Sequence, residues 1–112
     1  LYGDGSSGYS LMEYDTFVRH GINVNCLIGN DACWSQIERE QIPMFNDDVA
    51  CKLEYTDYHK FTEILDGRIH GAVIKKDEDI KGIVELANYS SKPVMINALI
   101  AKTDFRKGSI SV

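Results

Sequence analysis

Two short acidic stretches contain the residues whose types and spacing could do chemistry. Gly3-Asp4-Gly5 follows the apolar pair at residues 1–2, and Asn30-Asp31 follows the apolar run at 24–28. If these runs are neighbouring parallel strands, both loops leave the sheet at the same edge, and one carboxylate from each points into a shared crevice. Two carboxylates in one place raise each other's pKa, and a divalent cation removes their repulsion.

A phosphate group has a binding position beside these carboxylates. Gly5, Ser6 and Ser7 present backbone N–H groups just before an expected helix start, where the helix dipole favours anions. Mg²⁺ binds through one or two carboxylates together with phosphate oxygens. The two loops therefore predict a clamp of phosphate, metal and carboxylate. The alternative is a plain α/β domain with acidic loops, because Gly-Asp-Gly and Asn-Asp are also ordinary turn sequences.

The elements that must position these loops alternate between strands and helices. The patterns predict strands at 1–2, 24–28, 70–74 and 92–100. They predict helices from a capping box at Ser10 and Glu13 to Gly21, and then at 36–41, 56–66 and 77–88. Such alternation indicates an α/β fold, with a parallel sheet flanked by helices. The first strand is so short that we expect one domain over 1–112 that is truncated at its N-terminus.

Composition excludes several classes of function. The 112 residues carry a formal net charge of −5, which argues against nucleic-acid binding. No apolar run reaches the roughly 18 residues that a membrane span needs. The three cysteines fit no zinc spacing, so we expect reduced thiols in an intracellular protein, with Cys26 in the core. A missing N-terminal part could still attach the parent protein to a membrane. The polar tail at 101–112 is expected on the surface.

The span from Gly3 to Asp31 resembles the thiamine diphosphate-binding motif of thiamine-dependent enzymes. That motif is Gly-Asp-Gly, then fewer than thirty residues, then Asn-Asn or a variant. Nearly the whole chain is similar to the acetolactate-synthase-like branch, and within it to 2-hydroxyacyl-CoA lyase. The matching stretches are "GYSLMEYDTFVRHGI", "GNDACWSQIEREQ", "ACKLEYTDYHK" and "TDFRKGSISV". The resemblance implies a C-terminal thiamine diphosphate-binding fold with thiamine diphosphate and Mg²⁺ as cofactors.

Carried over residue by residue, the resemblance implies that Asp4, Asp31 and the backbone carbonyl of Cys33 bind Mg²⁺. The family's second Asn is Asp31 here, so Asn30 stays open as the alternative ligand, with Asp31 favoured. The residues expected around the diphosphate are Gly3, Asp4, Gly5, Ser6 and Ser7.

Further candidates follow the second loop directly. Trp34 and Gln36 are candidates for the wall that faces the cofactor's thiazolium ring and the substrate. The alternative for Trp34 is that it packs under the loop. Residues 38–40 are expected on a solvated helical face.

The activity that the resemblance implies is C–C bond cleavage or ligation of a small-molecule substrate, most similar to a 2-hydroxyacyl-CoA lyase. Ligation of 2-keto acids, as in acetolactate synthase, is one alternative, and a non-catalytic homologue serving as a binding or assembly module is another. A dinucleotide site is disfavoured, because Asp4 would meet the pyrophosphate with like charge. In the family the activating glutamate lies on another domain, usually of a neighbouring subunit. We therefore expect no catalytic residue here, an inactive fragment, and as partners the rest of the parent chain and a second subunit in a homodimer or tetramer.

Overall fold

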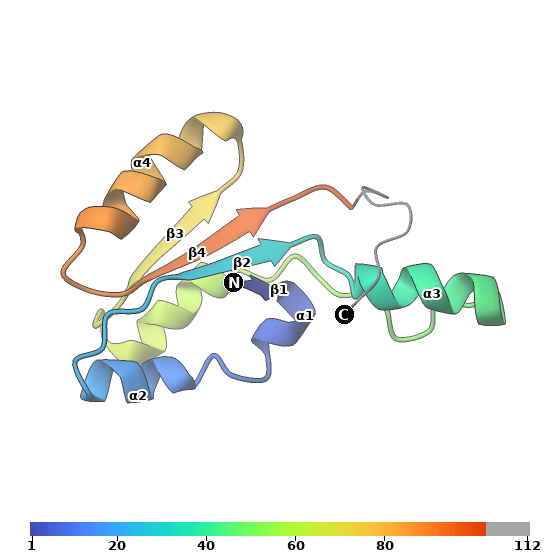
Figure 1. Cartoon of the computed structure of the whole chain (residues 1–112), viewed down its shortest axis with the longest axis horizontal. Helices are drawn as coiled ribbons and strands as arrows, with labels where there is room; N and C mark the ends of the chain where they lie inside the picture. The colour runs from blue at the N-terminus through green and yellow to red at the C-terminus, as the bar shows by residue number, and fades with distance from the viewer. Residues whose placement is uncertain (103–112) are drawn as a thin grey trace.

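A four-stranded parallel sheet organises the chain, with strand order β1-β2-β4-β3 (Figure 1). The computed structural model describes residues 1–102. Its strands are β1 (Tyr2–Gly3), β2 (Cys26–Asn30), β3 (His70–Ile74) and β4 (Val94–Leu99). The predicted α/β class with a parallel sheet flanked by helices is therefore confirmed.

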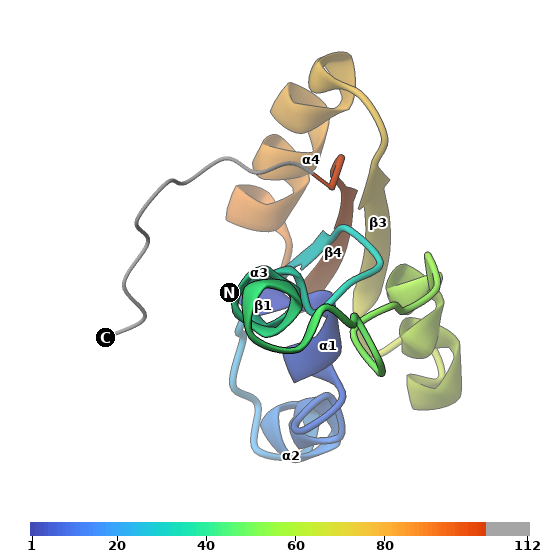
Figure 2. The same ribbon diagram turned by 90° about the vertical axis from the view of Figure 1, so that its right-hand side faces the viewer.

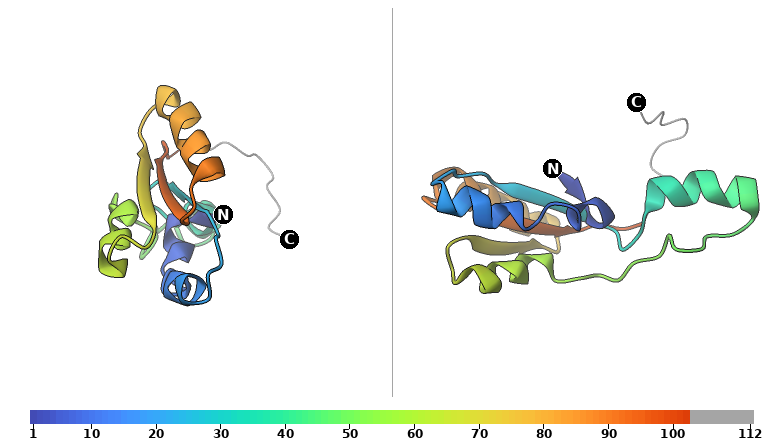
Figure 3. Two further views of the ribbon diagram at one scale, coloured as in Figure 1. Left: turned by 90° about the vertical axis from the view of Figure 1, so that its left-hand side faces the viewer. Right: turned by 90° about the horizontal axis from the view of Figure 1, so that it is seen from below.

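Helices cover both faces of the sheet, and one helix extends beyond it. The helices are α1 (Asp4–Ser7), α2 (Glu13–Arg19), α3 (Ser35–Phe45), the 3₁₀ helix η1 (Tyr58–Leu65) and α4 (Asp77–Tyr89). Figure 2 shows α4 and η1 on opposite sides of β3 and β4. Helix α3 projects past the end of the sheet where the strands point (Figure 3).

The hydrophobic core lies between the sheet and the helices α2 and η1. Its buried side chains are Tyr14, Cys26, Ile28, Leu65, Ile69 and Met95. The expected burial of Cys26 is confirmed, since this residue is 1% exposed. Helix α4 on the other face contributes no fully buried side chain. The segment between the two acidic loops, which contains α2, is therefore packed into the hydrophobic core.

Local structure differs from the sequence pattern around the first loop. The expected capping box does not form: helix α2 begins only at Glu13, and the Ser10 hydroxyl donates to the Tyr2 hydroxyl over 3.0 Å. The one-turn helix α1 was not predicted, because its residues are the small and turn-forming types that usually indicate loops. Gly21 ends this region as expected, with a left-handed φ of 66°.

Other boundaries shift without changing the order of elements. Strand β2 begins two residues later than predicted and ends at Asn30, so Asn30 belongs to the strand. The helix predicted at 56–66 is a 3₁₀ helix. Within residues 1–102, no helix is both long and apolar enough to cross a membrane. Of the tail predicted on the surface, residues 103–112 lie outside the described part of the chain.

Candidate cofactor-binding site

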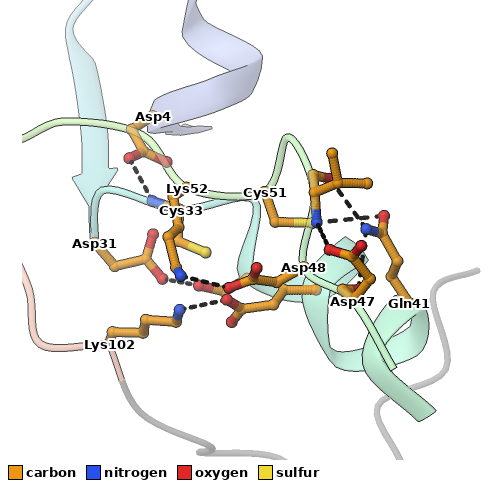
Figure 4. Close-up of polar contacts among 12 residues, drawn as sticks. Asp4, Asp31, Cys33, Gln41, Asp47, Asp48, Cys51, Lys52 and Lys102 are labelled. Carbon is orange, nitrogen blue, oxygen red and sulfur yellow. Dashed lines mark hydrogen bonds and ion pairs between the residues drawn. The ribbon is translucent and has the colours of Figure 1, made fainter. Parts of the chain in front are cut away.

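The two acidic loops leave neighbouring strands at the same edge of the sheet. Strands β1 and β2 pair in parallel, with Tyr2 opposite Ile28 and Gly3 opposite Gly29. Asp4 follows β1 directly, and Asp31 follows β2 directly. Figure 4 shows the Asp4 and Asp31 side chains at this edge. The two acidic loops therefore lie at one edge of the sheet, as the sequence predicts.

Asp4 is a buried carboxylate that joins the two loops. Its side chain is 2% exposed; Oδ1 accepts the Gly5 N–H over 2.9 Å and Oδ2 accepts the Cys33 N–H over 3.2 Å. Burial raises the pKa of the Asp4 carboxyl, the Gly5 N–H opposes this effect, and the charge of Asp31 raises the pKa further. A carboxylate that is desolvated beside a second carboxylate is stabilised by a cation.

Asn30 is buried completely and turned into the protein. Its Nδ2 donates to the Thr56 carbonyl over 3.1 Å and to the Asn97 Oδ1 over 3.2 Å, and its Oδ1 accepts the Ala32 N–H over 3.2 Å. Both ends of the amide are therefore engaged in internal hydrogen bonds. Asp31 is partly exposed, and its Oδ2 accepts the Ser35 hydroxyl. Of the two candidates, Asp31 presents the more accessible oxygens.

Sequence reasoning missed Asn97, the partner of Asn30. Asn97 is 0% exposed in the middle of β4, and its Nδ2 donates to the same Thr56 carbonyl over 3.1 Å. The two amides thus hold the chain segment before η1 against the edge of the sheet. The available signal was a single Asn inside the apolar run "VMINALI", because a buried polar group needs partners.

Cys33 is held in place through its backbone. Its side chain is buried, and its backbone forms an isolated antiparallel β-bridge with that of Lys52. On either side, Leu53 N donates to the Ala32 carbonyl over 2.9 Å and Trp34 N donates to the Cys51 carbonyl over 2.8 Å. Ala32 adopts a left-handed φ of 54°, which turns the chain between Asp31 and Cys33. The loop is therefore positioned by long-range contacts as well as by its own turn.

Of the residues expected around the diphosphate, Gly3 ends β1 and the other four form the single turn of α1. The Ser6 hydroxyl donates to the Gly3 carbonyl over 2.9 Å, and the Ser7 hydroxyl donates to the Asp4 carbonyl over 2.6 Å. Gly5 lies against the ring of Trp34, where an added Cβ would stand 2.4 Å from Cε2. Only glycine fits at this position without moving the indole.

Trp34 and Gln36, both expected beside the cofactor, lie in different surroundings. Trp34 is half-buried; it packs on Gly5, its ring centroid is 6.2 Å from that of Tyr9, and it lines a groove. Gln36 is exposed on α3 and is not among the residues that line this groove. The structure therefore brings Trp34 against Gly5 and leaves Gln36 on the exposed side of its helix.

The expected solvated face at 38–40 is wrong for Glu38. This residue is 9% exposed, and its Oε1 lies 2.6 Å from Nζ of Lys102. Lys102 follows β4, which ends beside β2. Its ammonium group therefore reaches the first turn of α3 (Figure 4). A pattern of consecutive charges does not reveal a partner 64 residues away.

The donor set fits a metal that arrives with a phosphate ligand. In the described residues, no group of three or more His, Cys, Asp or Glu side chains could hold a metal ion by itself. Asp4 and Asp31 offer two carboxylates, and Mg²⁺ takes its remaining ligands from backbone carbonyls, phosphates and water. The site fits Mg²⁺ together with a diphosphate rather than a free metal ion.

Comparisons with known proteins identify the family of this chain. Residues 1–98 match the family described as thiamine pyrophosphate enzyme, C-terminal TPP binding domain. The proteins named 2-hydroxyacyl-CoA lyase 2 from Danio rerio and Homo sapiens are each 48% identical over 117 residues, covering 100% of this chain and 18% of the relative. The acetolactate synthase large subunit IlvG of Mycobacterium tuberculosis is 32% identical over 100 residues, covering 88% of this chain and 18% of that protein. The chain thus spans less than a fifth of these relatives, and it belongs to the thiamine pyrophosphate enzymes as a C-terminal TPP-binding domain.

Proposed function

We propose that this chain holds the diphosphate of thiamine diphosphate through Mg²⁺, as the C-terminal domain of a thiamine-dependent 2-hydroxyacyl-CoA lyase. One observation carries the metal assignment: a buried Asp4 carboxylate, bonded to the loop after β2, lies beside the charge of Asp31. Mg²⁺ would neutralise both carboxylates and attract the diphosphate to the same edge.

Each residue has a distinct role in this proposal. Asp4 and Asp31 would bind the metal through side-chain oxygens, and Cys33 would bind it through its backbone carbonyl. Asn30 acts indirectly, because its amide holds the loop and the Thr56 carbonyl in place. Trp34 covers Gly5 and shields one side of the diphosphate loop from water. Thiamine diphosphate supplies the electron sink for C–C bond chemistry when bound.

The lyase assignment rests on similarity rather than on residues of the site. The relatives named 2-hydroxyacyl-CoA lyase 2 from fish and human share 48% identity with this chain, against 32% for the acetolactate synthase. Ligation of 2-keto acids is therefore the second candidate. In either case, we propose that the rest of the parent chain and a second subunit supply the catalytic groups and complete the site.

The decisive experiment is a calorimetric titration of the full-length protein with thiamine diphosphate, with and without Mg²⁺. The proposal expects tight binding only with Mg²⁺, and equal affinity in both titrations would contradict it. An activity assay then offers a 2-hydroxyacyl-CoA thioester and pyruvate side by side. Turnover of pyruvate alone would favour the acetolactate synthase-type reaction, and cofactor binding without turnover of either would favour a non-catalytic homologue.

A further inference from the structure

An open groove of about 320 Å³ lies beside the proposed cofactor loop. It is formed by the turn after α1, the first half of α3 and the segment that precedes the Cys33–Lys52 bridge. Its lining residues are Tyr9, Trp34, Ile37, Gln41, Val49, Ala50 and Cys51. The volume is within the range of small-molecule sites, roughly 300–1,000 Å³.

The Gln41 amide and the Cys51 thiol, which both line the groove, are engaged in hydrogen bonds. Gln41 Nε2 donates to the carbonyls of Val49 over 3.0 Å and Asp47 over 3.2 Å. Its Oε1 accepts the Cys51 thiol, whose sulfur is 3.6 Å away (Figure 4). Burial raises the pKa of the Cys51 thiol, so this group stays uncharged. Among residues 1–102, no Asp, Glu, Lys or Arg lines the groove. The surface offered to a ligand is therefore aromatic and aliphatic.

The groove is continuous with the site described above through one side chain. Trp34 both lines the groove and lies against Gly5 of the proposed diphosphate loop. Trp34 also follows Cys33 directly, so its backbone is fixed by the Cys51 carbonyl. A substrate whose reacting end is at the cofactor can extend along Trp34 into this groove.

We propose that the groove binds the aliphatic acyl chain of a 2-hydroxyacyl-CoA substrate, an inference that rests on the proposed function. A short 2-keto acid such as pyruvate has no hydrocarbon chain to occupy this volume. The lining residues of the described part of the chain include no Lys or Arg, so they favour a hydrocarbon chain over the phosphates of coenzyme A. Each methylene that enters an apolar site gains about 0.8 kcal/mol, or roughly fourfold in affinity. The dependence of kcat/KM on the length of the acyl chain therefore reports whether the groove is occupied.

The test measures kcat/KM of the full-length protein for a series of 2-hydroxyacyl-CoA thioesters of increasing chain length. In the unmodified protein, kcat/KM is expected to rise about fourfold per methylene until the groove is filled. Ile37→Trp and Val49→Trp place a large ring in the groove. Each is expected to lower the ratio of long-chain to short-chain kcat/KM by about tenfold or more.

Matched controls lie on the same helix outside the groove. Ile42 and Met44 are apolar and exposed on α3, and neither lines the groove. Ile42→Trp and Met44→Trp are expected to keep the chain-length profile of the unmodified protein. The same change of profile in these variants would overturn the proposal, since it would then reflect the helix rather than the groove.

The remaining outcomes separate this inference from the proposed function. A flat chain-length profile in the unmodified protein, with Mg²⁺-dependent cofactor binding intact, would overturn the groove assignment alone. So would an unchanged profile in Ile37→Trp combined with an altered oligomeric mass by light scattering, because a protein segment would then cover the groove. Loss of Mg²⁺-dependent cofactor binding in the unmodified protein would overturn both proposals together.

Discussion

The backbone N–H of Cys33 donates a hydrogen bond to the Asp4 carboxylate over 3.2 Å, joining two loops that are 29 residues apart in the chain. This contact ties the end of β1 to the turn after β2. Asp4 therefore has two tasks, because the same carboxylate organises the loop and faces the charge of Asp31. The first prediction separates these tasks.

Asp4→Asn keeps one acceptor oxygen for the loop and removes the negative charge. We expect the Mg²⁺-dependent part of thiamine diphosphate affinity to fall by more than about 100-fold, since even residues that only support a metal ligand change metal affinity by about 10–100-fold. Calorimetry of the full-length protein measures this effect. Asp15→Asn is the control, because Asp15 pairs with Arg19 on the far part of α2. Unchanged affinity in Asp4→Asn would exclude Asp4 as a ligand.

Asn30 and Asp31 are adjacent, but their substitutions should affect different properties: that of Asn30 the stability, and that of Asp31 the binding of Mg²⁺. Asn30→Ala leaves the Asn97 Oδ1 and the Ala32 N–H without the hydrogen bonds that Asn30 provides, so we expect a loss of about 1–3 kcal/mol in stability. Asp31→Ala removes an accessible carboxylate and should weaken Mg²⁺ binding with a smaller effect on stability. Thermal unfolding and Mg²⁺ titration distinguish the two. If Asn30→Ala alone abolished Mg²⁺ binding in a stably folded protein, Asn30 would be the ligand.

Gly5 and Trp34 should be energetically coupled. Gly5→Ala places a methyl group 2.4 Å from the indole ring, so we expect the ring to move and stability to fall by about 1–3 kcal/mol. In Trp34→Ala the obstructing ring is absent, and adding Gly5→Ala to it should cost little. A double-mutant cycle on thermal stability measures the coupling. Gly8→Ala is the control, because a Cβ there stands 3.6 Å from its nearest neighbour. Additive losses would contradict the observed contact.

Lys102 should stabilise the start of α3 through Glu38. The Glu38 side chain is nearly buried, so Lys102→Met leaves its charge without a partner, and the midpoint of urea unfolding should fall. The hydrogen bond that Lys102 donates to Glu38 raises the pKa of Lys102 above its ordinary 10.5. The stabilisation is therefore complete below pH 10.5, and it is lost as the pH rises through the pKa of the folded state.

Lys52→Met is the control for this prediction. Lys52 pairs with Asp48 over 2.6 Å, but both side chains are more exposed than those of Lys102 and Glu38. We expect a smaller change in the unfolding midpoint, because solvent screens exposed pairs. Equal effects of the two substitutions would show that the burial of Glu38 does not matter.

The order of elements and the edge that carries the acidic loops could be read from local patterns. Apolar runs followed by Asp4 and by Asn30-Asp31 predicted parallel strands, and such strands place the loops that follow them at one edge. The α1 turn, the late start of α2 and the 3₁₀ character of η1 could not be read in this way. They depend on tertiary contacts, such as the hydrogen bond from Ser10 to Tyr2, that compete with local propensity.

The sequence by itself determined the fold class, the two loops and the acidic side chains that they carry, because periodicity and residue chemistry are local properties. Only the tertiary structure decided that Asn30 turns inward to Asn97, that Trp34 lies on Gly5 and that Lys102 reaches Glu38. Each of these contacts joins segments distant in the chain, and their partners are chosen by strand order and packing. A linear pattern does not encode which of these distant side chains come into contact until the strands have been arranged in the sheet.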